Sequence, residues 1–197
     1  MNRTVFTLVC MFITLCSFAQ TSIESINFKI KDVSGELKAS NNTDNYYVLE
    51  YEGKSASELY TNILSSISNL YKNPQKVLST VENVSIKVSA TALDVKVPRD
   101  ESEINDVFPQ KYSYWGFDYR LSFQFKDGKI KVNAPSFDAD NVLHADSFTG
   151  GYYEPVAPVF PSLHFNNPSD KITIYFGKHI NDIIKEILTK SETVNNW

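Results

Sequence analysis

The sequence predicts an α+β domain, in which an antiparallel sheet of about five strands carries its helices on one face. Two stretches of the chain lead to this prediction. Residues 117–135 are two alternating segments joined by Asp127-Gly128, which is the pattern of a β-hairpin. Residues 55–70 start with a capping box and continue with apolar residues three and four apart, as in an amphipathic helix. This helix is about 25 Å long and matches a strand of about eight residues, so it can lie across the sheet.

The length and charge of the chain limit its class. At 197 residues the chain is long enough to form one domain whose core needs no disulfides. Its formal net charge is −4, and removal of residues 1–19 changes this to −5 (−4 minus the +1 of Arg3). We expect no nucleic-acid partner, because binding to phosphates requires a clustered basic face.

Residues 1–19 have the features of a secretory signal peptide. Arg3 gives a positive start, residues 5–16 are an apolar run, and Ser17-Phe18-Ala19 is a small-x-small cleavage site. Cleavage is expected between Ala19 and Gln20, which places the protein in the periplasm or outside the cell. The apolar run is shorter than the about 20 residues of a membrane span, so we do not expect an integral membrane protein.

Both cysteines of the chain, Cys10 and Cys16, lie in this leader. A lipid anchor on Cys16 is disfavoured, because Leu15 occupies a position where lipoprotein signals need a small residue. The mature protein has no cysteine, which excludes disulfides, thiol catalysis and cysteine metal sites.

Residues 20–45 are predicted to be an N-terminal extension. Its alternating run at residues 26–30 has the pattern of an edge strand, and the polar cluster at 40–45 that of a loop. The domain proper is predicted over residues 46–190. It starts with a strand at 46–51, which is rich in aromatic and β-branched residues.

Beyond the helix at 55–70, strands are predicted at residues 76–82 and 84–93, joined by a tight turn at Glu82-Asn83. An acidic loop follows at residues 98–109. The hairpin then has a defined register, because the two-residue type I′ turn at Asp127-Gly128 makes opposed residues sum to 255. The expected apolar pairs are Phe125 with Ile130, Phe123 with Val132 and Leu121 with Ala134, and the polar pairs are Gln124 with Lys131 and Ser122 with Asn133.

Residues 136–170 are predicted to be a long irregular insertion on the surface. They contain four prolines and Gly150-Gly151 without a sustained period, and loops of this length are usually functional or disordered. A short strand is predicted from Ile172, Ile174 and Phe176, then a C-terminal helix with apolar residues from Ile180 to Leu188. Residues 191–197 are predicted to be a tail.

The motif Glu-Gly-Lys-Ser-Ala-Ser-Glu-Leu-Tyr at residues 52–60 and the hairpin segment 119–134 resemble a family of uncharacterised exported proteins, found mainly in Bacteroidetes. The resemblance covers residues 46–142. It implies a TATA-box-binding-protein-like (TBP-like) fold, a curved antiparallel sheet backed by helices, without implying DNA binding. The family supplies no catalytic residues, and the proline-rich segment after Asp140 departs from its pattern.

Loops on a rigid scaffold are where binding residues concentrate, so the insertion is the expected place for a ligand site. The residues that we expect there, with a tryptophan as their neighbour on the scaffold, are Asp138, Asp140, His144, Tyr152, Tyr153, His164 and Trp115. Aromatic side chains in or near loops can stack on sugars or anchor a protein, so an envelope glycan or a protein is the expected partner. The alternative for Trp115 and two or three of the tyrosines is that they close the ends of the sheet.

No cofactor, metal or catalytic group is predicted. His144, His164 and His179 lack metal-site spacing, and the pattern Asp138-Ala-Asp140-Asn141 lacks the glycine and the later ligand of a calcium loop. Nucleophile-elbow and P-loop motifs are absent from the sequence.

The sequence leaves the function unknown and favours a non-enzymatic exported binding domain. One alternative is a hydrolase of cell-envelope polymers, which requires Asp138, Asp140, His144 and His164 to converge on one cleft. The other is an envelope-associated structural protein, which would show an exposed apolar patch of several hundred Å².

Overall fold

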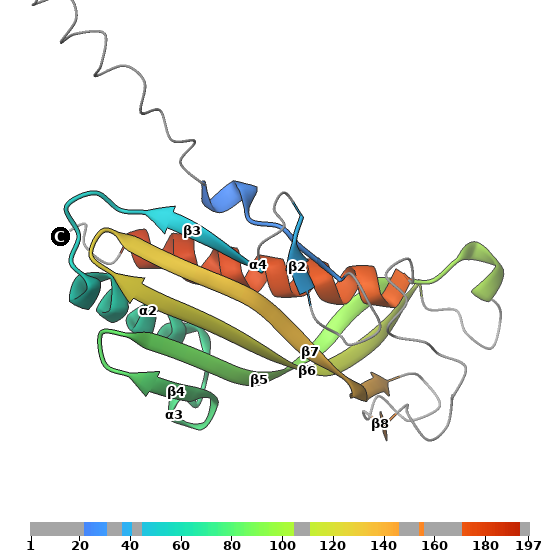
Figure 1. Cartoon of the computed structure of the whole chain (residues 1–197). Helices are drawn as coiled ribbons and strands as arrows, with labels where there is room; N and C mark the ends of the chain where they lie inside the picture. Colours follow the sequence, from blue (N-terminus) through green and yellow to red (C-terminus); the bar gives the residue numbers. More distant parts are fainter. Residues whose placement is uncertain are drawn as a thin grey trace, which may run out of the picture.

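The structure, a computed structural model, describes residues 22–30, 37–40, 45–104, 111–145, 154–155 and 171–193. These residues form two layers, a six-stranded antiparallel sheet and two long helices that cover one of its faces (Figure 1). The strand order is β3-β7-β6-β5-β4, with β8 paired to β7. The sheet strands are β3 (Tyr46–Glu50), β4 (Leu78–Val81), β5 (Ser85–Pro98), β6 (Tyr112–Lys126), β7 (Lys129–Ala145) and β8 (Glu154–Pro155). The predicted α+β class and antiparallel sheet are therefore confirmed, with six strands instead of about five.

The remaining elements are helical, apart from a separate two-stranded sheet near the N-terminus. The two long helices are α2 (Ala56–Leu70) and α4 (Lys171–Thr193). Short elements are η1 (Ile23–Ser25), α3 (Pro74–Val77) and η2 (Glu101–Glu103), and the small sheet consists of β1 (Phe28–Ile30) and β2 (Leu37–Ala39). The acidic loop predicted at 98–109 contains η2, and its residues 105–109 lie outside the described part of the chain.

The β6–β7 hairpin has the predicted register for its first five pairs, from Lys126 with Lys129 to Ser122 with Asn133. Gly128 has a φ of +71°, but Asp127 does not have a positive φ, so the predicted type I′ turn is wrong. Contacts with the β3–α2 connection hold the turn: the Gly128 N–H donates to the Lys54 carbonyl (2.7 Å), and the Tyr51 N–H donates to the Gly128 carbonyl (2.8 Å).

The predicted pairing of Leu121 with Ala134 is not found. The register shifts by one residue at this point, so that Arg120 faces Ser136. The extra residue falls beside Pro135, which has no N–H to donate to the ladder and is therefore tolerated at a bulge. The shift determines which side chains of β7 come to lie beside Arg120.

Helix α2 starts as predicted. The Glu58 N–H donates to the Ser55 hydroxyl (3.2 Å), and the Ser55 N–H donates to the Glu58 carboxylate (2.9 Å), which completes the capping box. Its buried stripe includes Ile63 and Ile67, and Tyr60 meets Phe125 of the sheet edge-on at 5.6 Å. Helix α2 therefore packs on the hairpin as expected, and it also packs against α4 (Figure 1).

Two boundaries at the predicted insertion are wrong. Residues 136–145 continue strand β7, and Val142 within them is completely buried, so these ten residues belong to the sheet and not to an insertion. The predicted strand at Ile172 to Phe176 is the first part of α4, because the buried positions there are Thr173, Phe176 and Gly177 at helical spacing while Ile174 is exposed.

The N-terminal extension contributes to the core of the domain. Ile26, Phe28 and Leu37 are at most 1% exposed, and β1 packs against α4. The predicted strand at residues 26–30 is present as β1, but it pairs with β2 in its own small sheet instead of at the edge of the main one. The first three residues of the predicted tail, 191–193, are the last three residues of α4, which ends at Thr193.

Candidate functional site

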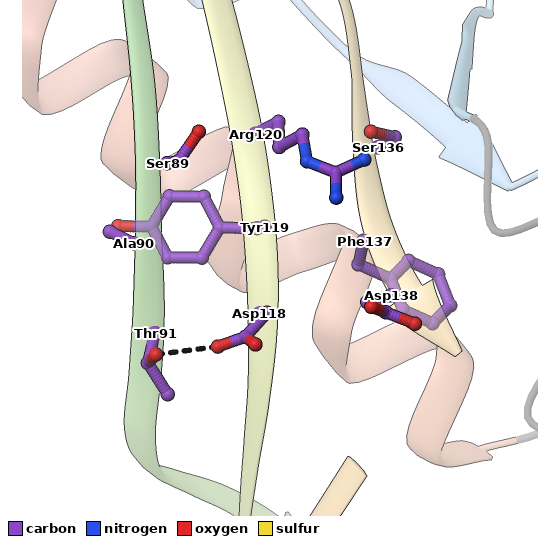
Figure 2. A pocket seen from close by; sticks show the side chains of 9 residues that line it. All are labelled: Ser89, Ala90, Thr91, Asp118, Tyr119, Arg120, Ser136, Phe137 and Asp138. Carbon is purple, nitrogen blue, oxygen red and sulfur yellow. Dashed lines mark hydrogen bonds between the residues drawn. The ribbon is translucent and has the colours of Figure 1, made fainter. Parts of the chain in front are cut away.

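The face of the main sheet that points away from α2 and α4 carries a polar pocket. Its volume is about 250 Å³, and it lies across the middle of β5, β6 and β7 (Figure 2). The lining residues are Ser89, Ala90 and Thr91 from β5, Asp118, Tyr119 and Arg120 from β6, and Ser136, Phe137 and Asp138 from β7. Three strands from different parts of the chain therefore supply the site.

Alternation along β6 places its polar side chains on this face. Phe117, Tyr119 and Leu121 are at most 3% exposed and belong to the core under the helices. Asp118 and Arg120 lie between them and point to the open face, because successive side chains of a strand alternate. The register then fixes their neighbours on the adjacent strands.

The pocket has two rows of side chains. In one row Arg120 lies between Ser89 of β5 and Ser136 of β7, its partners in the two ladders. In the other row Asp118 pairs with Thr91, whose hydroxyl donates to the carboxylate at 2.5 Å. Figure 2 shows Asp138 beside this second row.

Irregularities in both neighbouring strands lie next to the pocket. In β5 the register shifts between Ala92 and Val95, where Asp94 has a φ of +60°. In β7 the residues 138–141 oppose the single residue Asp118, because Phe117 pairs with Val142 and Tyr119 pairs with Phe137. Such bulges bend a strand, redirect its side chains and occur frequently next to binding sites.

Strand β6 is tightly packed between the two bulges at Gly116. A Cβ atom at this position would lie 2.8 Å from the Leu93 Cδ2 and 3.1 Å from the Ala92 carbonyl oxygen. Glycine at this point therefore allows the close approach of β5 and β6 that the bulged geometry requires.

Two tyrosine hydroxyls are hydrogen-bonded below the pocket, on the helix side. The Tyr119 and Tyr71 hydroxyls lie 2.6 Å apart, and burial is the main cause that raises the pKa of both. Both hydroxyls are therefore neutral at physiological pH, and the charged groups of the pocket are those of Asp118, Arg120 and Asp138.

Of the residues expected from the sequence to bind ligand, Asp138 lies in this pocket. Trp115 and His144 are opposite each other on β6 and β7, with ring centroids 4.4 Å apart. Trp115 is only 6% exposed, and its indole N–H donates to the Ser113 hydroxyl at 2.8 Å. The backbone of Asp140 belongs to the bulge in β7, while Tyr152, Tyr153 and His164 lie outside the described residues.

Asp138 and His144 do not converge on one cleft. Trp115 is on the buried face of β6 together with Phe117, and His144 lies against the Trp115 ring. Asp138 lines the pocket on the open face. The sheet separates these two side chains, so the arrangement expected for a hydrolase is not formed by the pair.

Five polar residues of the pocket were not among those expected from the sequence, namely Ser89, Thr91, Asp118, Arg120 and Ser136. The alternation of β6 could have identified Asp118 and Arg120 as polar-face residues, because they alternate with Phe117, Tyr119 and Leu121. The neighbours of Asp118 and Arg120 could not be predicted. The pairing of β5 with β6 has no short turn to indicate its register, and the bulges in β5 and β7 have no signal in the sequence pattern.

The residues that the structure describes contain neither a metal-binding cluster nor a membrane-spanning helix. No group of three or more His, Cys, Asp or Glu side chains among them is arranged to hold a metal ion. None of the helices within the same residues is long and apolar enough to cross a membrane.

Fold and site together define a two-layer α+β protein with a polar pocket on its open sheet face. A TBP-like protein from Parabacteroides distasonis has a similar structure, at 12% identity and a TM-score of 0.45, over 75% of this chain and 91% of that one. A DUF4468 family protein from Bacteroides ovatus is similar at 7% identity and a TM-score of 0.47, over 90% of this chain and 99% of that one. No family model and no curated protein matches the sequence.

The similarity concerns the fold. Similarity in fold does not determine the chemistry of a site, which depends on the residues of this chain.

Proposed function

We propose that this protein is an exported, non-enzymatic binding domain that holds a small polar ligand in the pocket on the open face of its sheet. One observation carries the proposal: charged and hydroxyl side chains of β5, β6 and β7 line one pocket where bulges interrupt both neighbours of β6. A bulge at such a point costs ladder hydrogen bonds, and the side chains that it redirects are typical of a binding site.

The leader at residues 1–19 supports export, because its charged start, apolar run and small-x-small site follow the signal-peptide pattern. The separation of Asp138 from His144 by the sheet favours binding over hydrolysis. Among the exposed large apolar side chains of the described residues, Val81 and Val84 share the turn between β4 and β5, while Leu93, Tyr112 and Ile174 are on β5, β6 and α4, which does not favour the structural alternative.

The test is a binding screen by NMR on the mature chain from Gln20, with amino acids, dipeptides, mono- and disaccharides and inorganic phosphate as probes. A binding probe is expected to shift the backbone amide signals of the pocket, at residues 89–91, 118–120 and 136–138. The double substitution Asp118→Asn with Arg120→Gln should abolish these shifts. Gln124→Ala is the matched control, because Gln124 is exposed on the same strand outside the pocket.

Two results would contradict the proposal. One is a probe that binds with shifts elsewhere and is insensitive to the double substitution. The other is a complete screen in which no probe shifts the pocket amides at millimolar concentration.

A further inference from the structure

The two rows of the pocket carry opposite charges. Arg120 lies between two serine hydroxyls in the first row, and the carboxylates of Asp118 and Asp138 lie in the second (Figure 2). A simple anion attracted by Arg120 would be repelled by the two carboxylates. A simple cation attracted by the carboxylates would be repelled by Arg120.

The separation of the rows sets the size of a ligand that satisfies both. Arg120 and Asp118 are two residues apart on one strand, so their Cα atoms are roughly 7 Å apart along β6. An extended chain spans up to about 3.5 Å per residue, so the two ends of a dipeptide are also about 7 Å apart. In a free amino acid the two charged groups share one carbon atom and are therefore closer together than the two rows are at their backbones.

The functional groups suit these two ends. A guanidinium binds a carboxylate through two parallel hydrogen bonds, and the Ser89 and Ser136 hydroxyls can donate to the same carboxylate. An ammonium group has three donors and no acceptor, which matches the acceptor oxygens of Asp118 and Asp138. The Thr91 hydroxyl donates to Asp118 and so orients its carboxylate.

We propose that the pocket binds a zwitterion of dipeptide size, with its carboxylate on Arg120 and its ammonium group between Asp118 and Asp138. This inference rests on the proposed function and specifies its ligand class. The volume of about 250 Å³ is near the lower limit for small-molecule pockets, which agrees with a ligand of two small residues.

The test is isothermal titration calorimetry on the mature chain with L-alanyl-L-alanine and two derivatives, N-acetyl-alanyl-alanine and alanyl-alanine amide. The unmodified dipeptide should bind. Each derivative, which lacks one charge, should bind at least about tenfold more weakly.

Two variants assign each end of the ligand to its row. Arg120→Gln should weaken binding of the dipeptide about tenfold and have little further effect on the amide, which has no carboxylate. Asp138→Asn should weaken binding of the dipeptide about tenfold and have little further effect on the N-acetyl derivative, which has no ammonium group. Lys87→Gln is the control, because it removes a charge from an exposed position of β5 outside the pocket.

The outcomes separate this inference from the proposed function. If the dipeptide and both derivatives bind equally well, and the Asp118→Asn, Arg120→Gln pair abolishes all three, the pocket is a binding site but the zwitterion is wrong. The same holds if the dipeptide gives no heat while a disaccharide or phosphate shifts the pocket amides. If the dipeptide binds equally well to the wild type and to every pocket variant, both the proposed binding site and the zwitterion as its ligand are wrong.

Discussion

The side chain of Asn181 on α4 binds both backbone polar groups of Phe28 on β1. Its Oδ1 atom accepts from the Phe28 N–H at 2.8 Å, and its Nδ2 atom donates to the Phe28 carbonyl at 2.9 Å. Nδ2 also donates to the Gly177 carbonyl of its own helix at 2.8 Å. A single amide thus acts on β1 as a neighbouring strand would, and it attaches the N-terminal extension to the last helix of the domain.

Replacing Asn181 should therefore destabilise the whole domain. In Asn181→Ala the Phe28 N–H and carbonyl lose their partners while still buried, so we expect a loss of about 2 to 4 kcal/mol in the free energy of unfolding. Lys178→Ala is the control, since Lys178 is exposed on the same helix and should change stability by less than about 0.5 kcal/mol. Urea titrations measure both, and equal effects would contradict a structural role for β1.

A second prediction concerns the two faces of the sheet. Phe123 is completely buried, so Phe123→Ala should cost about 3 to 5 kcal/mol. Gln124 is the next residue and is exposed on the open face, so Gln124→Ala should cost less than about 0.5 kcal/mol. A similar loss for the two variants in urea titrations would mean that the buried face has been assigned wrongly.

The parts of the fold that were predictable have local signals. A two-residue turn fixes the register of the hairpin around Asp127-Gly128, and a capping box defines the start of α2. In both cases residues close in sequence determine the structure. The first residues of α4 have no such signal, because Ile172, Ile174 and Phe176 alternate as in a strand although the chain is helical.

The unpredicted parts depend on tertiary contacts. Strand β7 continues past Pro135 only because β6 is there to pair with it, and the bulge at 138–141 occurs within that pairing. Asp138 was expected to bind ligand because it lies in the predicted insertion, but it belongs to β7, and its position beside Asp118 and Arg120 follows from the strand pairing and the bulge. The pocket is therefore a property of the assembled sheet, and no single segment of the sequence encodes it.

A third prediction concerns the contact between the hairpin turn and helix α2. The Asp127 carboxylate accepts from the Ala56 N–H at 2.9 Å, a backbone donor that the helix start would otherwise leave unpaired. Asp127→Ala should lower the free energy of unfolding by about 1 kcal/mol. Asp127→Asn keeps an acceptor oxygen and should lose less than half of that. Equal losses for the two variants in chemical denaturation would show that the side chain acts only through the turn.

A fourth prediction concerns the leader. When the full chain is expressed in a bacterial host with a functional secretion system, the exported protein should begin at Gln20, because Ser17-Phe18-Ala19 has the small-x-small pattern. Intact-mass spectrometry of the exported fraction reads this directly, and Ala19→Arg is a suitable variant because a large charged residue should block cleavage. An exported chain that retains residues 1–19, or carries a lipid on Cys16, would contradict the prediction.

The last prediction is a pH dependence that originates at His179 on α4. Burial is the main cause that lowers the pKa of this imidazole, and the neighbouring Asp182 carboxylate partly opposes the shift. The ring lies edge-on to Phe117 of the core, with centroids 6.1 Å apart. A lowered pKa means that the unfolded chain binds a proton more readily than the folded one.

The sign of the effect follows from this difference. The contribution of neutral His179 to stability is complete above the unfolded pKa of about 6.5, and it is lost as the pH falls through the lower folded pKa. Between about pH 7 and pH 5 the free energy of unfolding should therefore decrease more steeply for the wild type than for His179→Gln, which does not titrate. Asp182→Asn should make the decrease steeper than in the wild type, because it removes the carboxylate that favours the protonated ring. Equal slopes for the three proteins, or an NMR titration that places the His179 pKa at or above its unfolded value, would contradict the prediction.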